Sequence, residues 1–293
     1  MNIQWYPGHM TKTKRMMQEN ISLVDIVIEL LDARIPYSSR NPDIDKLAAN
    51  KKRIIILNKA DLADEAKTSE WVKHFEQNGI RVLLANSITG KGLKSITEVS
   101  ETLMAEKKER LKQRGRIHVP TRAMITGIPN VGKSTLINKF VGKSTAKTGD
   151  KPGVTRGKQW VKIKRDFELL DTPGILWPKF EDERVGTNLA FTGAVNDDIL
   201  DIVELSRLLI ERLREIYPQQ LKDRYSIDFD ENTKPHEILE AIGVSRGFKA
   251  RGGEVDFKRT STIFIDEFRA AKLGRMTLET PAEIAALSPE ENK

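Results

Sequence analysis

The 293-residue sequence predicts an α/β fold in which a doubly wound, mostly parallel sheet is followed by a small all-α domain. Three short apolar runs, at residues 24–31, 53–57 and 81–85, each end in a polar loop, as buried parallel strands with functional carboxyl ends do. Helical patterns at residues 64–77 and 93–114 separate these runs. Strand and helix therefore alternate along the chain, as a doubly wound sheet requires.

A second block of strand and helix follows. Residues 121–126 have the pattern of a strand that leads into a glycine-rich loop, and residues 133–140 have that of the helix after it. Residues 158–163 and 167–170 then resemble a β-hairpin. This hairpin is expected to deliver Asp171 to the carboxyl edge of the sheet.

Beyond the sheet, helical patterns at residues 197–217, 236–242 and 263–273 predict a small all-α module. A chain of 293 residues is long enough for two domains that each bury a core. We therefore expect an α/β domain over residues 1–178 and a helical domain over residues 179–293.

The charge of the chain favours an anionic partner. Its net charge is +7 and its isoelectric point is near 9.4. A moderate positive charge also serves solubility alone. Charge therefore indicates a class of partner without choosing between RNA and lipid.

Composition excludes several classes of site. The chain has no cysteine, which excludes disulfides, thiolate zinc sites and cysteine nucleophiles. The four histidines, His9, His74, His118 and His236, lack the paired spacing of metal ligands, so we expect no metal site except for magnesium. No apolar stretch approaches the ~20 residues that span a bilayer, and the N-terminus lacks the pattern of a signal peptide. We expect a cytoplasmic protein without a membrane span.

The run Gly127-Ile-Pro-Asn-Val-Gly-Lys133-Ser134 predicts a phosphate-binding loop, since a strand precedes it and a helix follows. Glycine lets the backbone N–H groups face a phosphate, and Lys133 neutralises the phosphate oxygens. The Ser134 hydroxyl and Asp171, in the downstream run Asp171-Thr-Pro-Gly174, are expected to hold Mg²⁺. The loop residues expected to contact the nucleotide are Asn130, Val131, Gly132, Lys133, Ser134 and Thr135.

The run Asn58-Lys59-Ala60-Asp61 predicts a guanine-recognition loop. The Asp61 carboxylate can accept hydrogen bonds from the ring N1–H and the exocyclic amino group of guanine, donors that adenine lacks on that edge. Asn58 is expected to fix the loop and reach the base, Lys59 to lie across the ring, and the Ser87 backbone to meet the guanine oxygen. The expected ligands are therefore GTP and GDP. A solvent-exposed turn after a strand is the alternative interpretation.

The order of the two loops is the reverse of that in an ordinary GTP-binding protein, because the guanine loop precedes the phosphate loop. A site assembled in space tolerates any chain order, provided that the same sheet is rebuilt. The sequence therefore predicts a circularly permuted Ras-like P-loop GTPase domain. In this order the chain after Gly174 runs out toward the helical domain, which connects a nucleotide-sensing loop to it.

Hydrolysis needs groups that sense the γ-phosphate and position water. Thr155 is expected to complete Mg²⁺ coordination, and the Gly174 N–H to contact the γ-phosphate. Ras-like enzymes orient the water with a glutamine directly after Asp-x-x-Gly, whereas here that position is Ile175, which predicts slow intrinsic turnover. His9 is the candidate replacement, and a packed or exposed N-terminal histidine is the alternative. With Lys133 and Thr155, His9 makes up the expected catalytic set.

Four runs in this permuted order resemble the ribosome biogenesis GTPase A family over nearly the whole chain. They are Trp5-Tyr-Pro-Gly-His9-Met, Asp32-Ala-Arg-Ile-Pro36, Pro152-Gly-Val-Thr155 and Asp171-Thr-Pro-Gly174. The resemblance implies a bacterial assembly factor for the large (50S) ribosomal subunit, with a GTPase that the ribosomal particle stimulates and a helical RNA-binding module. It also implies that His9 replaces the missing glutamine. The expected partners are the large-subunit precursor and its rRNA, and a monomer is expected.

Two positions near the site have alternative interpretations. Asn130 occupies the place where related potassium-activated GTPases have an asparagine that helps to hold K⁺, or it braces the loop. Asp32 and Arg34, at a strand end, are expected either to touch nucleotide or partner, or to form a structural salt bridge. The basic run at residues 107–116 is typical of a solvated helix face.

Basic residues alternate with apolar ones in the C-terminal region, a pattern that suits contacts with RNA phosphates. They are Lys249, Arg251, Lys258, Arg259, Arg269, Lys272 and Arg275. The alternative function is a GTP-dependent RNA-binding regulator with another RNA or a protein as its partner.

Overall fold

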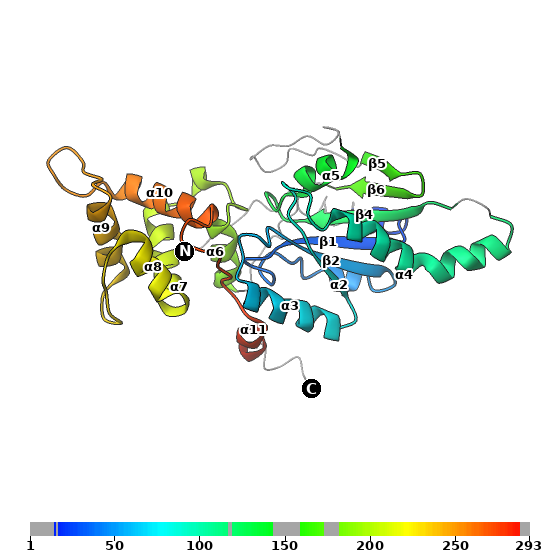
Figure 1. Ribbon diagram of the computed structural model, residues 1–293, viewed down its shortest axis with the longest axis horizontal. Coiled ribbons are helices and arrows are strands. Elements are labelled where there is room, and N and C mark those ends of the chain that lie inside the picture. Colours follow the sequence, from blue (N-terminus) through cyan, green and yellow to red (C-terminus); the bar gives the residue numbers. More distant parts are fainter. Residues whose placement is uncertain (1–14, 16, 117–118, 143–158, 173–181, 288–293) are drawn as a thin grey trace.

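The computed structural model describes residues 15, 17–116, 119–142, 159–172 and 182–287. At its centre is a six-stranded sheet with the strand order β3-β2-β1-β4-β6-β5 (Figure 1). Neighbouring strands are parallel except β5 and β6, which form the expected antiparallel hairpin. The prediction of a mostly parallel sheet is confirmed. The strands are β1 (Ile26–Asp32), β2 (Lys52–Asn58), β3 (Arg81–Leu84), β4 (Thr121–Gly127), β5 (Gln159–Lys164) and β6 (Phe167–Asp171).

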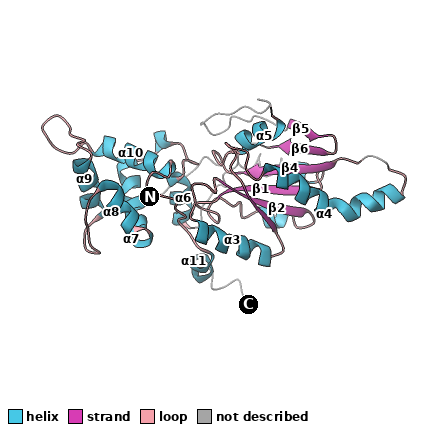
Figure 2. Ribbon diagram, viewed as in Figure 1, coloured by secondary structure: helices cyan, strands magenta, loops and turns pink. Residues whose placement is uncertain are grey.

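Helices cover both faces of this sheet (Figure 2). On the central strand β1, Ile28 and Leu30 pack in one core with residues of α4 and α5, whereas Leu31 packs in another with Trp71 and Phe75 of α3. Successive side chains of a strand point to opposite faces, so β1 is buried on both sides. The sheet is therefore doubly wound, as expected. These helices are α2 (Ile44–Leu47), α3 (Glu65–Gln77), α4 (Leu93–Gln113) and α5 (Lys133–Val141).

A helical domain lies beside the sheet (Figure 1). Helix α7 packs against α9 and α10, and one face of α7 is fully buried through Leu205, Leu209 and Leu213. The expected boundary at residue 178 lies outside the described residues. None of the described helices is long and apolar enough to cross a membrane. The helices of this domain are α6 (Glu183–Phe191), α7 (Ile202–Ile216), α8 (Pro218–Tyr225), α9 (Pro235–Ser245) and α10 (Phe257–Arg269).

Aspartate caps shift two helix bounds from those expected. The helix expected at residues 197–217 is divided into a 3-10 turn at Asp197–Ile199 and helix α7, because the Asp201 side chain accepts hydrogen bonds from N–H groups in the first turn of α7. The helix expected at residues 263–273 begins earlier, at Phe257, for the same reason. Apolar spacing finds a helix, but a polar cap decides where it begins.

After α10 the chain returns to the α/β domain through residues 276–279, which we call the strap. The Leu278 N–H donates a hydrogen bond to the Arg34 carbonyl oxygen of the α/β domain at 2.8 Å. The Leu278 carbonyl oxygen accepts one from Arg212 Nε of α7 at 3.0 Å. The strap thus joins the two domains, and it leads into α11 (Pro281–Leu287), which packs on α3.

A buried carboxyl group lies at the end of the strap. Glu279 is 3% exposed and accepts hydrogen bonds from the Ser38 N–H at 2.8 Å and the Ser38 hydroxyl at 2.7 Å. It also accepts one from Asn188 Nδ2 of α6 at 3.1 Å. Burial raises the pKa of Glu279 to about 7, although these hydrogen bonds oppose the change. The group therefore titrates near neutral pH within the contact between the domains.

We expect Glu279→Gln to remove a pH dependence of stability. The pKa of Glu279 is about 7 in the folded state against an ordinary 4.5, so between these pH values the folded protein holds more protons than the unfolded chain. Its stability therefore falls as the pH rises through this range and levels off above it. At about 1.4 kcal/mol per pH unit, the fall is at most about 3.5 kcal/mol.

Thermal unfolding of wild type and Glu279→Gln at pH 5 and pH 8 measures this effect. The variant should gain stability relative to wild type at pH 8. The same difference between the two proteins at both pH values would contradict the assignment.

Candidate nucleotide site

Polar loops singled out from the sequence meet at one edge of the sheet. Strands β1, β2, β3, β4 and β6 are linked by parallel pairings, so their carboxyl ends point the same way. This edge gathers Asn58 at the end of β2, Gly127 at the end of β4 and Asp171 at the end of β6. Loops far apart in the chain thereby become neighbours in space.

The Asn58 side chain joins three of these loops. Its Nδ2 donates to the Val131 carbonyl oxygen at 2.7 Å, and its Oδ1 accepts from the N–H and the hydroxyl of Ser87 at 3.0 and 2.8 Å. The Ser87 N–H expected to meet a base is therefore engaged with Asn58 in this structure. A Cβ at Gly132 would lie 2.5 Å from Asn58 Nδ2, and Gly132 has a φ of +99°, so only glycine fits there.

Helix α5 begins directly after the glycine-rich loop. Gly132 is its N-cap residue and, as a glycine, has no side chain that could cap the N–H groups of the first turn. The partial positive charge of such a helix end attracts anions, and its N–H groups can donate to phosphate oxygens. Ser134 and Thr135 lie half-buried in this turn. This local geometry is therefore suited to a phosphate, as the sequence predicts.

Lys133 and Asp171 form a buried ion pair beside this turn, with Nζ 2.5 Å from Oδ1. Burial lowers the pKa of Lys133, and the Asp171 carboxylate opposes that change. The other carboxylate oxygen of Asp171, Oδ2, is buried and accepts no hydrogen bond from the part of the chain described. A buried carboxylate oxygen without a donor suits a hard cation such as Mg²⁺.

A cavity of about 300 Å³ connects the two loops expected to bind the base and the phosphates. Lys59 and Asp61 line it from the first loop, and Gly132 and Thr135 line it from the second. Ser87, after β3, contributes from a third side. The structure thus brings the expected base-binding residues to one cavity with Asn130, Gly132 and Thr135 of the phosphate loop, whereas Val131, Lys133 and Ser134 do not line it.

The salt bridge considered for Asp32 and Arg34 is present. Arg34 Nε lies 2.9 Å from Asp32 Oδ1, and Arg34 Nη2 lies 2.7 Å from Oδ2. Lys59 Nζ lies 3.0 Å from Asp32 Oδ2 and donates to the Asn130 carbonyl oxygen at 2.9 Å. Burial raises the pKa of Asp32, but the two cations outweigh burial and hold this pKa well below its usual range. Asp32 therefore stays ionised and ties the guanine loop to β1.

Two residues of the helical domain, Thr192 and Arg269, also line the cavity, and no local pattern in the sequence places them there. The Arg269 guanidinium donates to the carbonyl oxygens of Ala190 at 2.9 Å and Phe191 at 3.0 Å, at the end of α6. It also forms an ion pair with Asp197 at 2.6 Å. The guanidinium that we expected to contact RNA is thus engaged within the protein.

The phosphate loop touches the helical domain directly. Asn130 Nδ2 donates to the carbonyl oxygen of Gly193, in the turn after α6, at 2.8 Å. The two residues are 63 positions apart, and no local pattern in the sequence points to their contact. Asn130 therefore has a bracing contact, and its expected role toward K⁺ stays a prediction.

Ile175, at the position of the missing glutamine, lies outside the described residues, and so do three residues with expected roles: His9, Thr155 and Gly174. Their roles in Mg²⁺ binding, γ-phosphate sensing and water positioning stay predictions.

Comparisons with known proteins extend over nearly the whole chain. A family model described as 50S ribosome-binding GTPase matches residues 122–239. The chain is 50% identical over 282 residues to ribosome biogenesis GTPase A of Bacillus pumilus, which covers 96% of this chain and 99% of that relative. It is 32% identical over 291 residues to the protein of the same name from Thermotoga maritima, with 99% of each chain covered.

Solved structures show the same similarity. A GDP-bound structure of YlqF matches with a TM-score of 0.67 and 27% identity, over 92% of this chain and all of that one. A GNP-bound structure of YlqF from T. maritima matches with a TM-score of 0.62 and 28% identity, over 92% and 98% of the two chains. The permuted order of the loops and the similarity along the full length have one explanation: the chain belongs to the ribosome biogenesis GTPase A family and is a GTPase.

Proposed function

We propose that this GTPase is a switch in the late assembly of the large (50S) ribosomal subunit. The GTP-bound form binds the precursor particle, and hydrolysis to GDP and phosphate releases it. The observation that carries the proposal is the composition of the cavity, which the guanine loop and the phosphate loop share with Thr192 and Arg269 of the helical domain. A change of nucleotide there can act on the domain that we propose binds rRNA.

The guanine base occupies the cavity lined by Lys59 and Asp61. Asp61 accepts hydrogen bonds from the base, and the stem of Lys59 flanks the ring. Asn58 mainly holds the loops in place, because its side-chain amide is already hydrogen-bonded to Val131 and Ser87. Selectivity for guanine therefore rests on Asp61, since adenine would leave a carboxylate without its donors.

The phosphates lie at the first turn of α5, where Lys133, Ser134 and Thr135 meet them. The Ser134 hydroxyl and Asp171 Oδ2 would hold Mg²⁺, and we propose Thr155 as a further ligand. A bound Mg²⁺ supplies positive charge that stabilises the phosphate oxygens. Lys133, which pairs with Asp171 in this structure, supplies a second cation at the same place.

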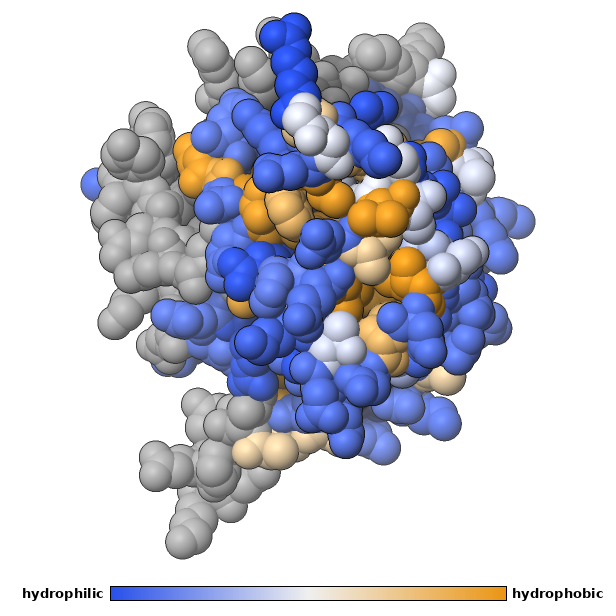
Figure 3. All heavy atoms as spheres, turned by 90° about the vertical axis from the view of Figure 1, so that its left-hand side faces the viewer, coloured by the Kyte–Doolittle hydropathy of each residue, from blue (hydrophilic) through white to orange (hydrophobic). Residues whose placement is uncertain are grey.

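The helical domain presents a surface suited to RNA. Two apolar side chains, Val244 and Phe257, are 60% and 38% exposed there. Figure 3 shows this end of the molecule, where hydrophobic side chains lie in islands between hydrophilic ones. Phosphates suit the basic groups, and riboses suit the apolar ones. Of the basic residues expected to contact RNA, those that are exposed are Lys249, Arg251, Lys258, Arg259, Lys272 and Arg275, although Arg275 Nε donates to the Ala63 carbonyl oxygen of the α/β domain at 2.8 Å.

We expect Asp61→Asn to change base specificity. The variant should lose about 100-fold or more in affinity for GTP and gain affinity for xanthosine triphosphate, because the asparagine amide can donate to the second xanthine oxygen. Titration with fluorescent nucleotides measures both affinities. Glu70→Gln, an exposed carboxylate-to-amide change on α3, is the control. Unchanged affinity of Asp61→Asn for GTP would place the base elsewhere.

We expect His9→Ala to abolish the stimulation of GTP turnover by large subunits while GTP binding survives. Ile175 cannot orient water, so turnover needs another polar group. Turnover of wild type and variant, each with and without purified large subunits in potassium buffer, tests partner and mechanism together. His236→Ala, at an exposed histidine of α9, is the control. A wild type that large subunits do not stimulate would leave a guanine-nucleotide switch with another RNA or protein as its partner.

We expect wild-type turnover to be faster in K⁺ than in Na⁺, because a cation held by Asn130 would add positive charge beside the phosphates. In Asn130→Ala the ratio of the two rates should fall to about 1. If the variant slows turnover equally in both salts, Asn130 acts through its contact with Gly193 rather than through an ion. Equal wild-type rates in both salts would also exclude K⁺ as a cofactor.

A further inference from the structure

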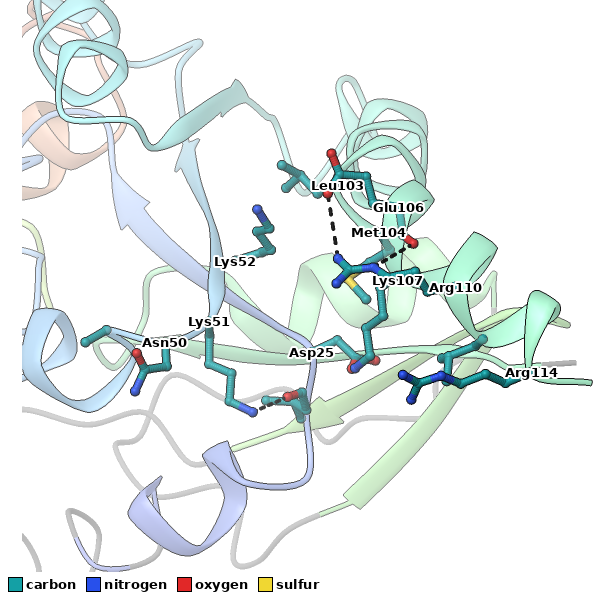
Figure 4. A pocket seen from close by; sticks show the side chains of 13 residues that line it. Asp25, Asn50, Lys51, Lys52, Leu103, Met104, Glu106, Lys107, Arg110 and Arg114 are labelled. Carbon is teal, nitrogen blue, oxygen red and sulfur yellow. Dashed lines mark hydrogen bonds and ion pairs between the residues drawn. The ribbon is translucent and has the colours of Figure 1, made fainter. Parts of the chain in front are cut away.

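A second cavity, of about 690 Å³, lies at the opposite edge of the sheet from the nucleotide site (Figure 4). One wall consists of Val24 and Asp25, which precede β1, and of Lys51 and Lys52, at the start of β2. The C-terminal half of α4 forms the other wall. We call this cavity the α4 groove. It lies where the strands begin, so its occupant and a nucleotide at the carboxyl ends can be bound at the same time.

Basic side chains dominate the α4 groove. Among the described residues, five basic side chains line it against two acidic ones, a surplus of three positive charges. They come from separate parts of the chain, since two belong to the segment that begins β2 and three to α4 and its C-cap. The basic residues are Lys51, Lys52, Lys107, Arg110 and Arg114, and the acidic residues are Asp25 and Glu106.

The acidic residues do not neutralise this surplus. Lys107 pairs with Asp25, and Arg110 Nη2 lies 3.7 Å from Glu106 within α4. Lys52 and Arg114 are exposed, and neither has an ion-pair partner in the ranges that the structure describes. In Figure 4 the Lys52 side chain extends toward α4, and the Arg114 side chain reaches back toward Asp25. Uncompensated cations on both walls favour an anionic occupant.

The dipole of α4 does not account for this arrangement. A helix C-terminus favours cations in its last turn only, where they contribute about 0.3–1 kcal/mol each. Lys107 lies before that turn, and Lys51 and Lys52 belong to another element. What these cations have in common is therefore their position at the groove, not a position at the end of the helix.

The floor of the groove is apolar. Val24 and Met104 are 3% and 4% exposed, and Leu103 and Leu111 are half-buried beside them. None of the described residues that line the groove is aromatic, so these residues offer no platform on which bases stack. An apolar floor with a basic rim suits riboses flanked by phosphates.

We propose that the α4 groove binds the sugar–phosphate backbone of ribosomal RNA. It is a contact of the α/β domain with RNA that is separate from the surface on the helical domain. The inference rests on the proposed function, because it takes the partner to be the ribosomal particle. Contacts of this kind are insensitive to RNA sequence and strongly dependent on salt.

The double variant Arg110→Gln/Arg114→Gln tests the groove. Both side chains are exposed, so folding and GTP affinity should be unchanged. The control is Lys73→Gln/Lys94→Gln, which removes the same charge from exposed positions outside the groove. Binding to large-subunit precursor particles and to protein-free rRNA is measured at several salt concentrations. The groove variant should bind both about tenfold more weakly, and the slope of log K against log salt should fall by about 1 to 2.

Three other results would overturn the proposal. If the groove variant and the control bind with equal affinity and equal salt slope, the groove is not an RNA contact. The proposed function would still stand, because the wild type binds the particles. Weaker binding to particles but not to protein-free rRNA would show that an acidic protein segment occupies the groove. A wild type that binds no particles would overturn both the proposed function and the groove assignment.

Discussion

The buried side-chain amide of Asn58 is the interaction on which the nucleotide site depends. It holds Val131 of the phosphate loop and Ser87 of the loop after β3, so one residue of β2 fixes three loops. Its removal would leave backbone groups buried without partners, at about 1–3 kcal/mol each. The same proximity requires glycine at position 132. The cavity that we propose holds the base thus exists because Asn58 keeps these loops together.

The helical domain lies next to the candidate nucleotide site and also contributes residues to it. Asn130 of the phosphate loop donates to Gly193, and Arg269 both closes the end of α6 and lines the cavity. The strap holds the domains together at a second place, through Arg34 and Arg212. Such contacts restrain the helical domain, and one of them includes a loop that we propose binds phosphates. Under the proposed function, a change of nucleotide at this loop would act on the helical domain through the contact between Asn130 and Gly193.

The proposed RNA contacts lie on two sides of the nucleotide site. The α4 groove is at the edge where the strands begin, and the helical domain flanks the edge where they end. Neither surface needs residues that we propose bind the nucleotide. An RNA particle bound to both would restrain the two domains relative to each other, and this restraint is a physical route by which the particle could stimulate hydrolysis.

The sequence by itself determined the strands, the phosphate loop, the guanine loop and their permuted order, because these signals lie within a few consecutive residues, such as 58–61 and 127–134. Apolar spacing also found α7 and α10, although aspartate caps moved where they begin. Only the tertiary structure decided that Thr192 and Arg269 line the nucleotide cavity. It also decided that the basic residues of α4 and Lys52 line one groove. These contacts join distant segments whose approach depends on how the domains pack, and no local pattern encodes that packing.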